Sequence, residues 1–513
     1  MDTSTVRLFR YFLIVVAAAP AVITVIVTRH WPLVGDALLT HYMAFLFDHG
    51  FAPYRDIVDM NMPGCMLFDW AVMHTMGPGA VAWRVVDGAL LATGAAAMMA
   101  AAKPYDWVGG LFGGAMLVIV HARDGVDQAG ERDLIVAVLL LVGCACALRA
   151  WRRDGWMLSL ACGLAAGAAV MMKPTAVVWA AGMLPIELAA MRKSGRGRAL
   201  RHGVAFVAGF LAVMGLTLGF LYQQHVLRDF FGTVTGLMAY HAGIDRLPFV
   251  YLISHLIPSW LFPVVLVWLL LAPGSVGWNQ WERGAILFSI LSGVFSFVAQ
   301  GKGFPYQRYP AEAFLLLAVG IDCSLALRQG KWRPIVAAAV LLYCVAVIAP
   351  VSIAKASHYD RTDELSASIE ADLSSLGGSK LSGQVQCLDT FAGCIGALYD
   401  MRLVQDTGFL YDCYLFHRPL TEVGKSLDDR FWPEMTTHPP RVIVVTDQFC
   451  YDETAGYQKL NNWPALSAWL EENYVLYADR PPQGMVHWWA QPRAANGYRV
   501  YVRREADRTA GQG

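Results

Sequence analysis

The chain has 513 residues, more than one soluble hydrophobic core normally holds, so at least two structural units are expected. Hydrophobic residues make up 56% and charged residues 16% of the sequence, whereas soluble domains average about 45–50% and about 25%. The 40 basic and 40 acidic residues cancel, so there is no overall attraction to nucleic acid, and no nucleic-acid partner is expected. The composition therefore predicts an integral membrane protein that resides in the lipid bilayer.

Windows of about 20 mostly apolar residues predict the membrane-spanning helices, because backbone amides in hydrocarbon must be satisfied within the helix. The first run follows Arg7 and Arg10 and lacks a clear small-residue cleavage site, so we interpret it as an uncleaved helix, with a cleaved signal peptide as the alternative. The predicted spans, about eleven, are 11–29, 80–102, 105–121, 134–151, 156–172, 174–191, 203–223, 249–272, 284–300, 311–328 and 334–353.

The apolar stretch 63–76 is too short to span and is broken by proline and glycine at both ends, so it predicts an interfacial or re-entrant helix. If the N-terminus is cytosolic, the basic loops around 149–153 and 192–201 then also face the cytosol, as the positive-inside rule requires. The opposite face receives the loops 30–79, 121–133, around 173, 224–248 and 300–310, together with the tail.

The tail has a different pattern from the rest of the chain. Alternating apolar residues at 441–446 and 498–503 predict strands, and 464–473 predicts a helix. We therefore expect a transmembrane domain at 1–353 and a small α/β domain at 354–513 on the outer face. Four tail cysteines permit two disulfides outside the reducing cytosol, although spacing does not determine their pairing. They are Cys387, Cys394, Cys413 and Cys450.

The first outer loop carries several ionisable residues close to the membrane. Asp36 follows the first span, where a carboxylate suits a general base or a metal ligand. The alternative is that Asp36 caps a helix. Arg55, Asp56 and Asp59 follow in the same loop, before Pro63. These residues are candidates for catalysis and substrate binding.

The second outer loop, 121–133, holds four acids and two arginines in thirteen residues. Glu131, Arg132 and Asp133 stand at its end, where the alternative is a solvated turn with Asp133 capping the next helix. Lys173, before a proline, adds a cation near the same face. Its alternative is a lysine that snorkels at a helix boundary.

A further outer loop combines glycines, cations and aromatic residues. Gly301 and Gly303 flank Lys302, which lets the backbone approach a ligand closely. Lys302 and Arg308 suit a phosphate, and Tyr306 suits a sugar or the membrane interface. This pattern favours anion binding, with interfacial anchoring as the alternative.

Acids and cations thus converge on one predicted surface, an arrangement suited to a base that acts on a hydroxyl while cations hold a phosphate leaving group. In chain order the features are Gly35-Asp36, the segment from Pro53 to Pro63, Gly130 to Asp133, Met172-Lys173-Pro174 and Gln300 to Tyr306. With them the chain resembles the GT-C glycosyltransferases that use lipid-linked sugars, the superfamily of protein O-mannosyltransferases and lipid A aminoarabinose transferases. The resemblance covers roughly residues 7–350.

The resemblance implies a polytopic helical fold and an inverting transfer of sugar from a polyprenyl-phosphate donor to a hydroxyl of a lipid, glycan or protein acceptor. It implies that Asp36 is the catalytic base and that the second acid is Glu131 or Asp133. Arg55, Asp56, Asp59, Arg132, Lys173, Lys302, Tyr306 and Arg308 form the predicted substrate-binding set. We expect a bacterial inner-membrane protein with a cytoplasmic N-terminus and a periplasmic active site.

Two departures from the family pattern bear on the chemistry. Ala37 stands where members often carry a second acid, which weakens a metal-dependent version and leaves the role of a divalent metal ion open. Met62 stands where a lysine often precedes the proline, so phosphate binding must use other cations. The competing hypothesis is a transporter or lipid flippase, for which ionisable residues near the bilayer midplane are expected. A third is a non-catalytic scaffold for the tail.

Overall fold

The structure is a computed structural model, and it divides into two compact units. It describes residues 3–126, 129–244, 246–274, 277–330, 332–357, 363–390, 392–417, 420–448, 456–482, 485–488, 491–494 and 496–504. Unit 1 contains Met1–Leu33, Met62–Phe220 and Arg246–Tyr359, and unit 2 contains Val34–Asn61, Leu221–Asp245 and Asp360–Gly513. Both units are built from separated segments, whereas the sequence predicted a single boundary after residue 353.

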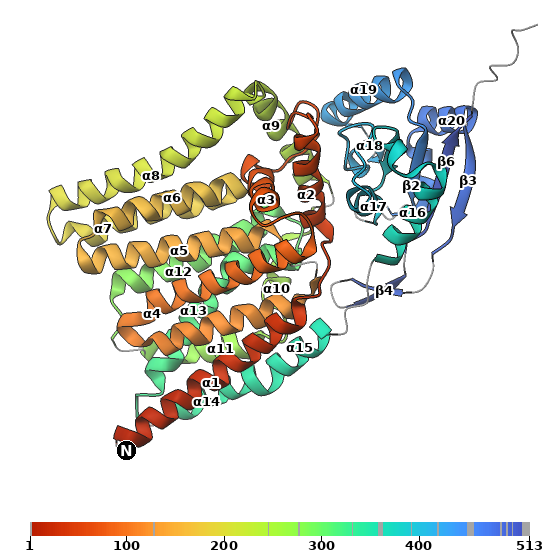
Figure 1. Cartoon of the computed structure of the whole chain (residues 1–513). Coiled ribbons are helices and arrows are strands. Elements are labelled where there is room, and N and C mark those ends of the chain that lie inside the picture. The colour runs from red at the N-terminus through yellow and green to blue at the C-terminus, as the bar shows by residue number, and fades with distance from the viewer. Residues whose placement is uncertain are drawn as a thin grey trace, which may run out of the picture. The chain divides into compact units, whose positions relative to one another are not determined.

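Unit 1 is helical, and its long helices lie side by side (Figure 1). Its helices are α1 (Thr3–Thr28), α3 (Pro63–Thr75), α4 (Ala80–Asp124), α5 (Arg132–Arg153), α6 (Trp156–Met172), α7 (Val177–Arg192), α8 (Arg196–Gln223), α10 (Phe249–His255), α11 (Phe262–Leu271), α12 (Gln280–Gln300), α13 (Tyr309–Ala326), α14 (Arg333–Tyr343) and α15 (Ala349–Ser357). Within the described chain, seven helical segments are long and apolar enough to cross a membrane, and three shorter ones are also apolar. The count of eleven spans stays a prediction.

Helix α4 is two helices joined by a sharp bend. Pro104 precedes the bend, and Asp106 has extended backbone angles. The Asp106 carboxylate accepts a hydrogen bond from the Val108 amide at 3.1 Å, which caps the second half. The two halves pack closely, because a Cβ on Gly110 would lie 2.4 Å from the Met98 carbonyl oxygen. The two helices predicted at 80–102 and 105–121 are therefore present and form a hairpin.

The single span predicted at 249–272 is wrong. The chain there forms two short helices, α10 and α11, that are separated by an irregular segment. Pro258 lies in that segment, and a proline removes a backbone donor and disfavours helix in the residue before it. Hydropathy alone did not register this interruption. By contrast, the short helix predicted at 63–76 is present as α3, with 13 residues.

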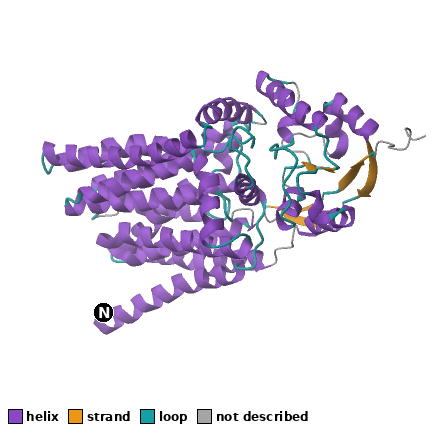
Figure 2. Cartoon of the chain, turned by 45° about the horizontal axis from the view of Figure 1, so that its top comes forward, coloured by secondary structure: helices purple, strands orange, loops and turns teal. Residues whose placement is uncertain are grey.

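Unit 2 combines helices with the strands of the protein (Figure 2). Its helices are α2 (Gly35–Asp48), α9 (Leu227–Gly243), α16 (Asp363–Leu376), α17 (Cys394–Asp400), α18 (Cys413–Phe416), α19 (Glu422–Thr437) and α20 (Pro464–Asn473). A four-stranded sheet has the order β1 (Val385–Leu388), β2 (Val442–Thr446), β6 (Tyr498–Arg503) and β3 (Tyr474–Arg480), and β4 (Met485–Trp488) pairs with β5 (Gln491–Ala494). Strands β1 and β2 are parallel, and the other pairs are antiparallel. The strands predicted at 441–446 and 498–503 and the helix predicted at 464–473 are confirmed.

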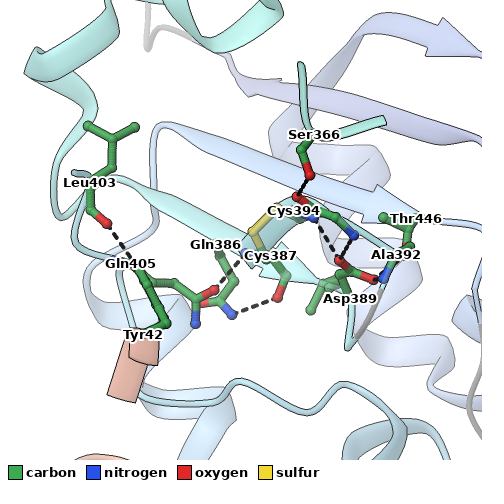
Figure 3. The surroundings of a disulfide bond; sticks show 12 residues. Tyr42, Ser366, Gln386, Cys387, Asp389, Ala392, Cys394, Leu403, Gln405 and Thr446 are labelled. Atoms are coloured by element: carbon green, nitrogen blue, oxygen red, sulfur yellow. Dashed lines mark hydrogen bonds between the residues drawn. A yellow bond between two sulfur atoms is a disulfide. The ribbon is translucent and has the colours of Figure 1, made fainter. Parts of the chain in front are cut away.

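The first loop of the chain is tied into unit 2 by hydrogen bonds to the backbone of the tail. Tyr42 of α2 donates its hydroxyl to the Leu403 carbonyl at 2.9 Å and accepts from the Gln405 amide at 2.8 Å (Figure 3). The Val58 amide donates to the Gly408 carbonyl at 3.0 Å. A Cβ on Gly408 would lie 1.9 Å from the Asp56 carbonyl oxygen, so this contact requires glycine. The loop and the tail therefore form one packed body.

A disulfide fixes the turn that follows β1. Cys387 and Cys394 are bonded, and Asp389 between them accepts hydrogen bonds from three backbone amides at 2.8–3.0 Å (Figure 3). Thr446 at the end of β2 donates to the same carboxylate at 2.9 Å. Cys413 is also disulfide-bonded, and Cys450 lies outside the described residues. The predicted use of the tail cysteines in disulfides is thus confirmed for Cys387 and Cys394.

Helices α4 and α13 cross at their closest point through glycine. A Cβ on Gly320 would lie 2.1 Å from the Gly109 carbonyl oxygen, and one on Gly109 would lie 2.5 Å from the Gly320 carbonyl oxygen. In a bilayer, where lipid tails are as apolar as leucine, such close backbone packing is a main source of helix association.

We expect Gly320→Ala to destabilise the protein by about 1–3 kcal/mol, because the added methyl overlaps backbone that cannot move away. The matched control is Gly284→Ala in α12, where a Cβ meets no atom within 4 Å. There the better helix propensity of alanine should raise stability by up to about 1 kcal/mol. Thermal unfolding midpoints in detergent should therefore shift in opposite directions, and equal shifts would contradict the crossing.

Candidate functional site

A buried chain of polar residues joins both ends of the α4 hairpin to the start of α13. His121 contacts the Tyr309 hydroxyl through Nδ1 at 2.5 Å and the Asp87 carboxylate through Nε2 at 3.0 Å. All three side chains are buried. Buried polar groups need such partners, because an unsatisfied one costs several kcal/mol. The chain therefore holds three helix ends at one level of unit 1.

Arg308 lies beside this chain, in the turn η4 (Pro305–Arg308) before α13. Its guanidinium is 3.1 Å from the Asp124 carboxylate and 3.5 Å from that of Glu312. Its Nε also donates to the Pro305 carbonyl at 3.2 Å. Arg308 is buried within unit 1, so the alternative of an exposed interfacial anchor is wrong for this residue.

The glycines before this turn have the conformation that the sequence suggested. Gly301 and Gly303 both have φ of +70°, where a side chain would be strained. Gly301 accepts a backbone hydrogen bond from Leu247 at 2.8 Å. Lys302 and Tyr306 are both buried, and both have interaction partners. The loop is thus a folded part of the protein interior.

Asp133 and Lys173 form a buried ion pair on the neighbouring helix ends. The Lys173 ammonium donates to both carboxylate oxygens at 2.6 Å. Two of the simpler interpretations are therefore wrong, because Lys173 does not snorkel to the surface and the N-cap of α5 is Glu131. Glu131 is buried too, and Arg132 is half-buried.

These groups form one cluster, which we call the polar layer. The Gly130 amide is hydrogen-bonded to Asp87, which connects the second loop to the α4 hairpin. Its members are Arg84, Asp87, His121, Asp124, Glu131, Asp133, Lys173, Arg308, Tyr309 and Glu312. Arg84 lies 3.5 Å from Asp87, yet its three guanidinium nitrogens are buried with no hydrogen-bond partner among the described residues. Such a guanidinium is suited to an anionic ligand.

Asp36 belongs to unit 2, in the first turn of α2. The N-cap of this helix is Val34, so the helix-cap interpretation of Asp36 is wrong. The Asp36 carboxylate is half-buried and has an interaction partner, and its backbone carbonyl accepts from Thr40 at 2.7 Å.

Arg55, Asp56 and Asp59 also belong to unit 2. Arg55 and Asp56 pair with each other at 3.2 Å, and the Asp56 carboxylate accepts from the Ala52 amide at 2.7 Å. Burial acts to raise the pKa of Asp56, but the hydrogen bonds from Arg55 and Ala52 outweigh it and hold that pKa below its ordinary value. Asp59 is buried, and its carboxylate accepts a hydrogen bond from the side-chain amide of Asn61 at 2.9 Å. These contacts shape the loop.

Two acids of the polar layer form close ion pairs with cations, Asp133 with Lys173 and Asp124 with Arg308. Among the described residues, no group of three or more His, Cys, Asp or Glu side chains is arranged to hold a metal ion. Carboxylates that are engaged in this way neutralise guanidinium and ammonium groups in the protein interior. Asp133 and Asp124 therefore hold Lys173 and Arg308 in position. The catalytic role of Glu131 or Asp133 stays a prediction.

Comparison with solved structures shows a fold shared along nearly the whole chain. The crystal structure of ArnT from Cupriavidus metallidurans bound to undecaprenyl phosphate matches 95% of this chain and 98% of that chain, with TM-score 0.61 and 11% identity. The oligosaccharyltransferase AglB from Archaeoglobus fulgidus, in complex with an inhibitory peptide and a dolichol-phosphate, matches 91% of this chain and 73% of that chain, with TM-score 0.54 and 10% identity. The apo form of the Archaeoglobus fulgidus oligosaccharyltransferase matches 85% and 69%, with TM-score 0.51 and 9% identity.

No protein-family model matches the sequence, and no curated protein matches it. At about a tenth sequence identity, the structural likeness establishes the fold. The chain has the GT-C fold that the order of its loop residues indicated.

Several members of the polar layer were not singled out from the sequence. Asp124 was one of four acids in a loop, and Glu312 lay inside a predicted apolar span. Asp87 and Arg84 also sit within a predicted span, where ionisable residues are rare and usually functional. That rarity was the available signal, and it lies in the apolar segments rather than in the loops.

We expect Lys173→Met to cost about 3–5 kcal/mol, because it leaves the Asp133 carboxylate buried without its partner. The double substitution Asp133→Leu with Lys173→Met should recover most of this loss, since both charges are then removed. The control is Lys193→Met, at an exposed lysine just after α7. Thermal unfolding in detergent provides the measurement, and an unchanged midpoint for Lys173→Met would contradict the ion pair.

Asp406 in unit 2 is a titratable group whose pH behaviour is measurable. Burial, together with the nearby Glu434, raises the pKa of Asp406 to about 7. The folded state therefore holds a proton that the unfolded state, with a carboxyl pKa near 3.8, releases between about pH 4 and about pH 7. We expect unit 2 to lose stability as the pH rises through this window and Asp406→Asn to abolish the effect.

Hydrogen exchange of the β1 amides tests this expectation, because the Asp406 amide is bonded to the Val385 carbonyl at 2.8 Å. Protection corrected for intrinsic exchange should fall between about pH 4 and about pH 7 in the wild type. Asp429→Asn, an exposed position in α19, is the control and should keep the wild-type pH profile. A flat wild-type profile would contradict the raised pKa of Asp406.

Proposed function

We propose that this protein is a membrane glycosyltransferase that transfers a sugar from a polyprenyl-phosphate donor to a hydroxyl of a lipid, glycan or protein acceptor. The observation that carries the proposal is the polar layer, in which buried cations occupy one end of a GT-C-type helical unit. Neighbours of the same fold were solved with undecaprenyl phosphate and with dolichol-phosphate. A phosphate leaving group carries negative charge, which the buried cations of the polar layer would stabilise.

The reaction is a single displacement at the anomeric carbon of the sugar. The acceptor oxygen forms a bond to this carbon while the bond to the phosphate oxygen breaks, and both electrons of the broken bond leave with the polyprenyl phosphate. A carboxylate takes the proton of the acceptor hydroxyl. Attack opposite the leaving group inverts the anomeric configuration, which is the stereochemistry we propose. The atoms and charges of this step balance between donor, acceptor and carboxylate.

Arg308 and Arg84 are the cations that we assign to the phosphate, with Lys302 as a further contact. A guanidinium pairs with phosphate through parallel N–H donors, and Arg84 has buried donors without a hydrogen-bond partner among the described residues. Preorganised cations of this kind stabilise the developing negative charge on a leaving phosphate at little reorganisation cost. Asp124 and Glu312 hold Arg308 in position, and Asp133 with Lys173 supports the second-loop backbone.

Asp36 is the base in this proposal, on the strength of its position after the first helix and the family resemblance. Arg55, Asp56, Asp59, Arg132 and Tyr306 stay proposed substrate-binding residues. We further propose that the protein lies in a bacterial inner membrane with a cytoplasmic N-terminus and a periplasmic active site and tail. The basic loops around 149–153 and 192–201 support this orientation.

The first test incubates purified protein with a panel of polyprenyl-phosphate sugars and follows free polyprenyl phosphate by mass spectrometry. We expect release of polyprenyl phosphate and formation of a glycosylated acceptor. Asp36→Asn should lower the transfer rate by about 10²–10⁴-fold, because the acceptor proton loses its base. Asp48→Asn, at the exposed end of the same helix, makes the same chemical change and should keep full activity.

Arg308→Gln should lower kcat/KM by about 10²–10³-fold, because one charge-stabilising donor is lost. Thermal midpoints and elution profiles of each variant separate loss of chemistry from loss of folding. Movement of intact donor across a liposome membrane without its consumption would instead favour the transporter or flippase hypothesis. Full transfer activity in folded Asp36→Asn protein would remove Asp36 from the mechanism.

A further inference from the structure

A second group of cations lies outside the polar layer, where the end of α4 meets α15. Arg123 of α4 stacks over the Trp260 ring, 5.5 Å from its centroid. The Tyr343 hydroxyl donates to the Trp260 carbonyl at 3.0 Å, which holds this aromatic residue in place. Lys355 of α15 lies close enough to Arg123 for the two positive charges to repel each other. We call these four residues the interfacial site.

The two cations of this site have little compensating negative charge. Asp124, the acid beside Arg123 in the chain, attracts both cations, but its ion pair at 3.1 Å is with Arg308. No described carboxylate lies within ion-pair distance of Arg123 or Lys355. Two of the Arg123 nitrogens, Nε and Nη1, are also buried without a hydrogen-bond partner among the described residues. Two adjacent cations with spare donors are suited to an anion with several oxygens.

The surroundings indicate that this anion comes from the bilayer. Val347 and Val351 are exposed by 47% and 40%, and Lys355 follows them at the same helical spacing on the same face. Exposed valines on an apolar helix that is long enough to span a membrane face lipid tails. A lysine one turn beyond them, near a tryptophan and a tyrosine, lies at the level of lipid head groups.

The geometry of this region is held by Trp31. Its ring lies 5.9 Å from that of His121, one half-turn before Arg123, and its Nε1 donates to the Ala356 carbonyl, next to Lys355, at 3.2 Å. The buried Trp31 side chain thus contacts both His121, two residues before Arg123, and Ala356, the residue after Lys355. The π-helical segment Cys344–Ile348 follows Tyr343, and such segments frequently mark functional sites.

We propose that Arg123 and Lys355 bind the phosphate of an anionic glycerophospholipid, with Trp260 and Tyr343 packing against its glycerol region. The site is separate from the proposed donor phosphate site, whose cations are Arg308 and Arg84. Basic residues beside membrane helices attract anionic head groups, each contributing about 1 kcal/mol. An occupied site would neutralise the surplus charge at the end of α4 and hold α15 against it.

Native mass spectrometry of the purified full-length protein tests this proposal, with phosphatidylglycerol as the probe and phosphatidylcholine as the uncharged reference. The wild type should retain phosphatidylglycerol in preference to phosphatidylcholine. Arg123→Gln with Lys355→Gln should weaken phosphatidylglycerol binding by roughly tenfold or more. The matched control, Arg192→Gln with Lys193→Gln, removes the same charge from another helix end and should bind like the wild type.

Three results would overturn the proposal. They are unchanged phosphatidylglycerol binding in the double variant, an equal loss in the control pair, and displacement of the bound lipid by an equimolar amount of undecaprenyl phosphate. The last result would assign the site to the donor or its product. Lys355→Gln alone, at an exposed position, keeps the test available if the double variant does not fold. Sugar transfer measured in parallel is expected to persist in this variant, so failure of this proposal is distinguishable from failure of the proposed function.

Discussion

The arrangement of unit 1 depends on His121, whose ring contacts Asp87 on one side and Tyr309 on the other. Inside an apolar bundle, an imidazole and a carboxylate are stable only when their hydrogen-bonding groups are matched. This requirement fixes the two halves of the α4 hairpin and the start of α13 at a common level. Arg84, Asp124 and Arg308 lie within a turn of these three residues in the chain, so the same constraint places the charged groups.

Burying charged side chains inside a membrane protein costs free energy, and the polar layer contains several of them. The layer remains stable because most members are paired, as Lys173 is with Asp133 through two hydrogen bonds of 2.6 Å. Arg84 departs from this balance, since its only nearby charge partner among the described residues is Asp87 at 3.5 Å. The buried Arg84 donors that have no hydrogen-bond partner among the described residues are suited to the oxygens of a phosphate.

The same balance of charge distinguishes two regions at the end of the α4 hairpin. In the polar layer, Arg308 is surrounded by Asp124, Glu312 and backbone carbonyls, which fix its orientation. At the interfacial site, Arg123 has an aromatic ring and a second cation as neighbours, and Asp124, which attracts it, forms its ion pair with Arg308. Acids that fix a guanidinium suit catalysis, whereas aromatic residues and exposed valines suit a lipid head group.

Local sequence patterns determined much of this protein, because hydropathy and strand alternation depend on neighbouring residues. They predicted the membrane class, the short helix α3, the helix at 464–473 and strands β2 and β6. The chemistry of the loop residues also singled out Asp133, Lys173 and Arg308 as candidate site residues. One alternative, that Lys173 snorkels, was wrong because composition does not show that a side chain is buried. The single helix predicted at 249–272 was also wrong, because hydropathy does not show where a helix is interrupted.

Only the tertiary structure decided the pairing of distant residues. Asp124 meets Arg308 across 184 positions of the chain, and Tyr42 meets Leu403 across 361. It also decided that the loop 34–61 packs with the tail in unit 2. The sequence alone established which residues carry charge and which segments are apolar. Which charge neutralises which was settled by helix packing, because electrostatic and hydrogen-bond energies depend on distance and burial rather than on separation along the chain.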